Sequence, residues 1–421
     1  KTESLSVRCA HGKITEVGAD LSARKGETVL DAQHGALIPG LHDHHIHLLA
    51  TAAAQLSIDC AGLNEAQFVA ALKTAALQTK EGELRAVNYH ESIAGPLDRW
   101  RLDGWVKNQA LRIQHSTGQM WFLNSQALAE YGLEHHRSDA IERSPEGTPN
   151  GRLFRGDSLI KQKTTTKRAP SLHALSRELT SYGITGVTDT SHNNTDEEFA
   201  LLRAKQNAGE LLQHLRVMGR GELTEVQKNS NQNNNDLAPN IHSGELKILL
   251  DEAALPDLDE LIETVKNCHK NNRGVAVHCV TQIELAIVLN VFSEAGVSHS
   301  KDDRQSRIEH ASLLPASTLA QVQELGLTAV TQPGLIYSRG DRYLSELNPQ
   351  ELSQLYRLQS LQQHGIPLAL SSDAPYGPLN PWLNMQCSVD RKTAGGALVN
   401  ANEGLTPEQA LRAYCGSADQ P

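Results

Sequence analysis

Four histidines crowd into one short segment of this 421-residue sequence, directly after an apolar run. The segment spans residues 39–47 and reads Pro-Gly-Leu-His-Asp-His-His-Ile-His. In an extended chain, residues i and i+2 point the same way, so His45 and His47 can reach one metal ion. His42 and His44 form a rival pair in the other register, and a plain surface run of histidines is the alternative to both.

Three further candidate ligands follow short apolar runs in the second half of the chain. His278 follows residues 275–277, His310 follows residues 307–309, and Asp373 follows residues 368–372. Each of them alone is compatible with a satisfied core residue. Together with the histidine segment they supply the nitrogen and oxygen ligands that zinc or another divalent metal uses, and such a set supports hydrolysis by an activated water.

A strand-then-helix rhythm from residue 244 onward predicts the elements that position these residues, and it is typical of a parallel sheet. The steps along the chain are 31 residues from Lys247 to His278, 32 to His310 and 63 to Asp373. A (β/α)₈ barrel has about 31 residues per unit. The spacing therefore places these four residues on strands four, five, six and eight, with the histidine segment on strand one, and catalytic residues of a barrel gather at the carboxyl ends of its strands.

The remaining segments predict additions to the barrel. The predicted fold class is α/β, a (β/α)₈ TIM barrel. Residues 1–35 alternate like a β-hairpin and would form part of a small β domain. The barrel is expected over residues 36–405, with insertions between about residues 48 and 245, and residues 406–421 are expected to begin with a helix. Candidate strands in the inserted region are 84–89, 111–114, 186–189 and 214–219.

These motifs resemble the amidohydrolase superfamily, in the branch that includes N-substituted formamide deformylases. The family pattern is met by Pro39-Gly40 through Asp43 to His45 and His47, by Lys247, by His278, by Arg307 to His310, by Ser372-Asp373 and by Asn124-Ser125-x-Ala127-Leu128. The likeness spans nearly the whole chain. It implies that the small β domain is a β-sandwich built from the chain ends, with residues 406–421 forming a C-terminal helix and the start of the return to it, and the sequence leaves the completeness of that domain open. The likeness departs at Gln119, where many members carry a histidine, and this departure leaves the substrate-side contacts open.

The resemblance implies an amidohydrolase that acts on carbon–nitrogen bonds other than peptide bonds. It implies that His45, His47 and Asp373 bind one Zn²⁺, that His278 and His310 bind a second, and that a carboxylated Lys247 bridges the two. A lysine paired with Asp251 or Glu252, beside a single ion, is the alternative. A metal-activated hydroxide would attack the amide carbonyl, and Asp373 would carry the proton to the leaving amine.

Contacts to a small-molecule substrate are predicted from polar residues that follow strands. Residues that would line the pocket mouth are Tyr89, His90, Glu91, His115 and Gln119, and Arg339 and Arg342 would clamp a carboxylate. Each arginine is equally compatible with a structural ion pair. The same site is compatible with deamination or cyclic-amide opening, because a fold alone does not fix the substrate.

Two alternatives from other classes remain. Residues 156–159 spell the Gly-Asp-Ser-Leu tetrapeptide of a serine esterase family, although that motif belongs after a first strand near the chain start. A non-catalytic barrel is the other alternative, and the intact ligand set argues against it.

Composition limits the partners. A formal net charge of -10 argues against nucleic acid, and no apolar run approaches the roughly 18 residues of a membrane span. A cytoplasmic enzyme is expected, although the first residue is Lys1 rather than Met, which is compatible with a trimmed leader. A homo-oligomer is expected by analogy alone.

Overall fold

The computed structural model describes residues 5–11, 13–33, 35–78, 82–157, 159–160, 169–220, 240–250, 252, 255–298 and 306–416. The chain divides into two compact units, residues 1–40 and 41–421. In the first unit, β1 (Ser6–Ala10) and β2 (Lys13–Gly18) pair antiparallel as a hairpin. The domain boundaries expected at residues 35 and 405 stay a prediction.

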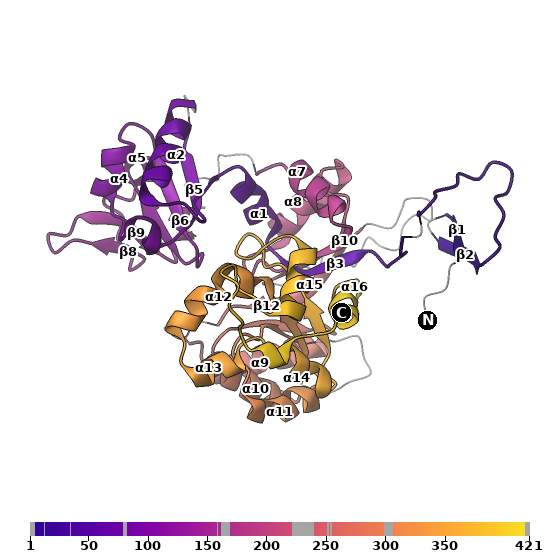
Figure 1. Ribbon diagram of the computed structural model, residues 1–421. Helices are drawn as coiled ribbons and strands as arrows, with labels where there is room; N and C mark the ends of the chain where they lie inside the picture. The colour runs from indigo at the N-terminus through magenta and orange to yellow at the C-terminus, as the bar shows by residue number, and fades with distance from the viewer. Residues whose placement is uncertain are drawn as a thin grey trace. The chain divides into compact units, whose positions relative to one another are not determined.

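Eight parallel strands form the central sheet of the second unit (Figure 1). Each strand pairs with the next one along the barrel, from first to last. Their bounds are β3 (Leu41–Ile46), β10 (Ile184–Asp189), β11 (His214–Gly219), β12 (Ile241–Ile248), β13 (Val275–Cys279), β14 (Arg307–His310), β15 (Thr328–Thr331) and β16 (Leu368–Leu370). The predicted (β/α)₈ barrel is confirmed. The strands predicted from the residue spacing as four, five, six and eight are β12, β13, β14 and β16 in the structure.

The first and last barrel strands meet at their carboxyl ends. The backbone N–H of Asp373 donates to the carbonyl of His45 at 2.8 Å, and that of His47 donates to the carbonyl of Ala374 at 2.9 Å. These bonds nearly close the sheet. They also bring the two most distant parts of the predicted ligand set to one rim.

Helices connect the barrel strands, as parallel pairing requires. Local signals start several of them: Thr281 and Glu284 form a capping box at α10, and Asn348 precedes a proline at α13. The bounds are α1 (Leu48–Gln55), α7 (His173–Ser181), α8 (Asp196–Asn207), α9 (Leu258–Lys270), α10 (Gln282–Glu294), η2 (Ala316–Thr318), α11 (Leu319–Glu324), α12 (Gly334–Glu346), α13 (Pro349–Gln354), α14 (Leu358–Gln363), α15 (Pro381–Asp390), η3 (Ala401–Glu403) and α16 (Pro407–Cys415).

The inserted region lies between the first two barrel strands along the chain and has a six-stranded sheet of its own, drawn in purple in Figure 1. Its strands are β4 (Ile58–Asp59), β5 (Leu84–Tyr89), β6 (Leu111–His115), β7 (Met120–Leu123), β8 (Ile141–Arg143) and β9 (Pro149–Phe154), and its helices are α2 (Glu65–Gln78), α3 (Glu91–Ala94), α4 (Arg99–Trp105) and α5 (Ser125–Glu130). Phe68, Tyr89 and Phe122 form part of its core. Two of the four candidate strands therefore belong to this inserted sheet, and the other two are barrel strands β10 and β11.

Helix α16 ends the described part of the chain and packs against β3 and β16. The expected return to the small β domain falls on residues 417–421, outside the described residues. Within the described ranges, no helix combines the length and apolarity needed to cross a bilayer.

Candidate metal centre

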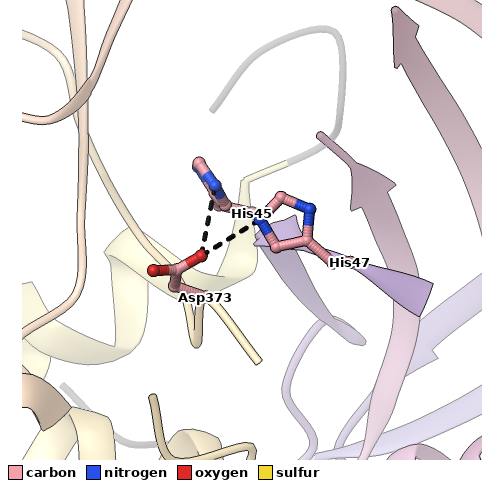
Figure 2. A group of neighbouring side chains, drawn as sticks. All are labelled: His45, His47 and Asp373. Carbon is pink, nitrogen blue, oxygen red and sulfur yellow. Dashed lines mark ion pairs between the residues drawn. The ribbon is translucent and has the colours of Figure 1, made fainter. Parts of the chain in front are cut away.

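The predicted ligands gather at the carboxyl ends of the barrel strands. Figure 2 shows Asp373 with its Oδ1 3.4 Å from Nε2 of His45 and 3.3 Å from Nε2 of His47. The centre of the His310 ring lies 4.8 Å from that of His45 and 4.5 Å from that of His278. The fold thus brings together side chains from β3, β13, β14 and the loop after β16.

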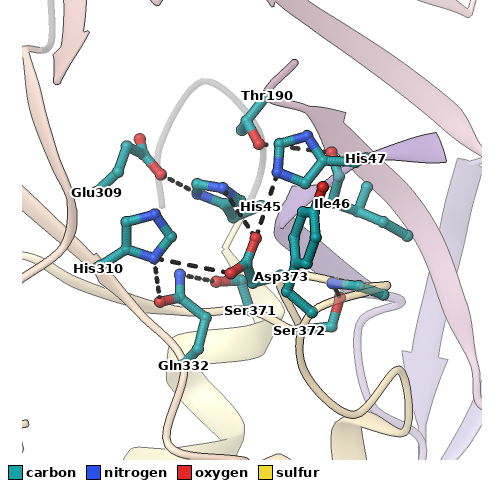
Figure 3. Close-up of polar contacts among 12 residues, drawn as sticks. His45, Ile46, His47, Thr190, Glu309, His310, Gln332, Ser371, Ser372 and Asp373 are labelled. Atoms are coloured by element: carbon teal, nitrogen blue, oxygen red, sulfur yellow. Dashed lines mark hydrogen bonds and ion pairs between the residues drawn. The ribbon is translucent and has the colours of Figure 1, made fainter. Parts of the chain in front are cut away.

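Two of these residues have unusual backbone geometry. His310 and Asp373 have φ values of 70° and 53°, in the left-handed region that non-glycine residues rarely adopt. Neighbours in a regular strand point to opposite faces, yet Glu309 and His310 both contact His45 (Figure 3). Backbone strain of this kind is typical of functional sites.

Three imidazoles each make a hydrogen bond through Nδ1, which leaves the Nε2 atom of each ring available to bind a metal (Figure 3). The Nδ1 partners are Glu309 for His45, Ser191 for His47 at 3.1 Å, and Gln332 for His310 at 2.8 Å. A metal-ligating histidine almost always donates its other ring N–H to such an acceptor, which fixes its tautomer. No role could be predicted for Glu309, Ser191 or Gln332 from the residue pattern, although each lies at or just after the end of a strand.

Electrostatics favour the forms that bind a cation. Burial lowers the pKa of His45 to about 3 and that of His278 well below its usual value. Burial alone would raise the pKa of Asp373, but the neighbouring imidazoles of His47, His310 and His45 lower it below its usual value. Neutral imidazole and ionised carboxylate are the forms that ligate divalent metals.

Lys247 is buried on β12, and its Nζ has no hydrogen-bond partner. Burial lowers its pKa to about 8, against the attraction of Glu309. Of the expected alternative partners, Asp251 lies outside the described residues and Glu252 accepts from the hydroxyl of Thr281. An unpaired buried amine is unfavourable, so the position calls for a further group.

The residues present fit a divalent cation. Asp373 Oδ1 is buried without a hydrogen-bond partner between two imidazole Nε2 atoms, which is the place a cation would occupy. The rival pair does not join this group: His42 Nε2 bonds Thr188 Oγ1 at 2.8 Å, and His44 lies outside the cluster of possible ligands. The register with His45 and His47 is the one that the fold uses.

Of the predicted substrate residues in the inserted sheet, one lies in the hydrophobic core and three form a cluster at the strand ends. Tyr89 is a core residue that packs on Phe68 and Phe122, so its expected place at a pocket mouth is wrong. His90, Glu91 and His115 form a second His/carboxylate cluster at the ends of β5 and β6. In that cluster His115 Nε2 lies 3.0 Å from Glu91 Oε2.

The two arginines and Gln119 make protein contacts. Arg339 donates to two backbone carbonyls, and Arg342 Nε lies 3.6 Å from Glu346 on the same helix. Gln119 is exposed, with its carbonyl bonded to the backbone N–H of Arg155. The structure thus gives each of these side chains or segments a protein partner.

The Gly-Asp-Ser-Leu tetrapeptide does not lie where a serine esterase of that family would carry it. Ser158 lies outside the described residues, and Asp157 accepts a hydrogen bond from Trp121 Nε1 at 2.9 Å. The tetrapeptide follows β9, a late strand of the inserted sheet, rather than a first strand.

Comparison with known proteins agrees with the barrel fold. The chain is 25% identical over 461 residues to the N-substituted formamide deformylase of Arthrobacter pascens, covering 97% of this chain and 84% of the relative. An uncharacterised metal-dependent hydrolase of Pyrococcus horikoshii has the same fold, with a TM-score of 0.68, 18% identity, and coverage of 89% of this chain and 79% of that one. One from Pyrococcus furiosus gives a TM-score of 0.65, 20% identity, and coverage of 89% and 80%.

The family assignment rests on nearly the full length of the chain. Residues 28–419 match the amidohydrolase family, and this range contains every barrel strand and every rim residue described above. The chain therefore belongs to the amidohydrolase family, hydrolases that act on carbon–nitrogen bonds other than peptide bonds.

Proposed function

We propose that this protein hydrolyses an amide-type carbon–nitrogen bond of a small molecule at a divalent metal centre, with Asp373 as the proton shuttle. The observation that carries the proposal is the buried, unpartnered Oδ1 of Asp373 between the Nε2 atoms of His45 and His47. A carboxylate in this position can both hold a cation and exchange a proton with a neighbouring water.

The ligand set would divide into two groups around Lys247. His45, His47 and Asp373 would hold one Zn²⁺, and His278 and His310 would hold a second. The lone Nζ of Lys247 supports its conversion to a carbamate by addition of CO₂ to the neutral amine with loss of a proton, which would turn an otherwise cationic side chain into an anionic ligand between the two groups. Metal bound there would lower the pKa of a water to about 7 and polarise the substrate carbonyl.

The protein residues then move the proton. Asp373 accepts the proton of the attacking water on its carboxylate and delivers it to the nitrogen of the leaving amine. Glu309, Ser191 and Gln332 keep the imidazoles oriented while this happens. Because water is the nucleophile, no covalent acyl-enzyme is needed.

The proposed substrate class is suggested by a relative that matches nearly the whole chain. The protein from Arthrobacter pascens is an N-substituted formamide deformylase, and we propose small N-substituted amides, formamides among them, as the class that this chain cleaves. Deamination of a ring and opening of a cyclic amide are the alternative reactions of the same site.

A panel assay with metal analysis tests the proposal. Purified protein should contain one or two equivalents of divalent metal and hydrolyse at least one of four classes: formamides, N-acyl amino acids, cyclic amides and amino-heterocycles. Chelation should abolish the activity, and added Zn²⁺ should restore it. A serine esterase would keep its activity in chelator, and a non-catalytic barrel would turn over no member of the panel, so either result would refute the proposal.

A further inference from the structure

One guanidinium joins the inserted sheet to the loop that carries Asp373. Nη2 of Arg339, on α12, donates to the carbonyl of Ser116 at 3.0 Å and to the carbonyl of Tyr376 at 2.8 Å. Ser116 begins the turn between β6 and β7, at residues 116–119, and Tyr376 lies three residues after Asp373. A charged donor shared between two carbonyls makes a strong, directional link between these segments.

The turn approaches the loop so closely that it requires glycine. Gly118 has a φ of +75°, and a Cβ atom there would lie 2.5 Å from Cε1 of Tyr376. Both the left-handed backbone and the lack of space exclude a side chain at this position. The backbone of the inserted turn therefore packs directly on the aromatic ring.

The same ring contacts a predicted metal ligand. Tyr376 and His47 have ring centres 5.5 Å apart with an interplanar angle of 75°, an edge-to-face arrangement. The backbone N–H of Tyr376 donates to the backbone carbonyl of Asp373 at 2.7 Å, and the buried Gln114 of β6 donates to the carbonyl of Gly118 at 3.5 Å. The ring is thus fixed from the barrel by its own backbone and from the insertion by the turn.

We propose that the inserted domain completes the substrate side of the metal centre, with Tyr376 as a wall beside His47 and Arg339 as the positioning residue that holds the turn against this wall. Arg339 thereby acts on the protein backbone rather than as a clamp for a substrate carboxylate. The kinetic consequence rests on the proposed function, whereas the structural link between the two segments does not.

The test replaces Arg339 with methionine, which keeps much of the side-chain length and removes every donor. Loss of two hydrogen bonds from a charged group should raise amide exchange at residues 115–119 by about tenfold or more. For the best amide of the panel, KM should rise about tenfold while kcat changes by less than about threefold, because the rim ligands are untouched. Metal content should stay at the wild-type value.

Two further variants keep the result interpretable. Arg412→Met removes an exposed arginine that pairs with Glu408 on α16, and it should change neither exchange at the turn nor KM. Gly118→Ala disturbs the same contact from the other side and should reproduce the KM effect of Arg339→Met.

The outcomes separate the two proposals. Unchanged exchange at residues 115–119 in Arg339→Met would overturn the link, and so would a parallel fall of kcat and metal content, which would mark a general structural role. If no amide is hydrolysed by the wild type, the proposed function fails, and the exchange measurement still decides whether Arg339 holds the turn.

Discussion

The barrel rim and the inserted sheet each carry two histidines beside a carboxylate, and the two groups differ in their surroundings. At the rim, His45 and Asp373 are buried, and Asp373 Oδ1 has no hydrogen-bond partner. In the inserted sheet, Nε2 of His115 donates to Glu91 at 3.0 Å, Nδ1 of His115 is bonded to the hydroxyl of Thr117 at 2.8 Å, and the Glu91 side chain is 44% exposed. Ligand-type residues alone therefore do not mark a metal site; the rim differs in having an unsatisfied carboxylate oxygen between two imidazoles.

The tautomers separate the two clusters as well. Nδ1 of His90 accepts from the backbone N–H of Ser92, and Nδ1 of His115 accepts from the backbone N–H of Thr117, both at 3.2 Å. A neutral ring that accepts at Nδ1 carries its proton on Nε2, which then cannot bind a metal. At the rim, Nδ1 of His45 faces the carboxylate of Glu309, which only accepts, so Nε2 keeps its lone pair.

The largest expected difference comes from the two carboxylates. Asp373→Asn should lower kcat about 10³-fold, because the amide cannot accept and return the proton. Glu91→Gln should leave kcat within about twofold, since an exposed pair of this kind contributes little. Steady-state kinetics on the best amide measures both values. Equal losses in the two variants would remove the distinction between the clusters.

A smaller effect is expected from the two buried lysines. Lys247→Met should lower the metal content from two equivalents to one and reduce activity about 100-fold, because the bridging group is lost. Lys205 is also buried, but its Nζ is paired with Glu210 at 3.1 Å, so Lys205→Met should keep the metal. Elemental analysis and incorporation of isotopically labelled bicarbonate at Lys247 measure the difference. Full metal content in Lys247→Met would contradict the bridging role.

The rim could be predicted from the sequence because a barrel repeats. The intervals between Lys247, His278, His310 and Asp373 match whole barrel units, and any residue at a strand's carboxyl end must reach the same rim. The inserted sheet has no such period. Its strands β5 and β6 carry the same local pattern as barrel strands β10 and β11. The rule that a residue at the end of a strand faces the active site was therefore applied to Tyr89, whose side chain lies instead in the hydrophobic core of the inserted sheet.

The partners of the ligands could not be predicted. Glu309 and His310 both reach His45 because the left-handed backbone at His310 breaks the alternation of β14. Tyr376 meets Gly118 only through the placement of the insertion against the barrel loop. Contacts of this kind join residues that no local spacing relates.

The smallest expected effect is the sharpest test of the comparison. His115→Ala removes an imidazole, a side chain of the type that binds metal, but both of its ring nitrogens already have hydrogen-bond partners in Thr117 and Glu91. We expect unchanged metal content and a change of at most about 1 kcal/mol in the free energy of unfolding, the usual contribution of an exposed ion pair. His47→Ala removes an imidazole whose Nε2 lies beside the unpartnered oxygen of Asp373. We expect it to lower metal affinity by about tenfold or more, because one metal ligand is lost. Titration of both apoproteins with Zn²⁺ compares them directly. If His115→Ala lost metal as His47→Ala does, hydrogen-bond satisfaction would fail as the property that separates a metal centre from a cluster of similar residues.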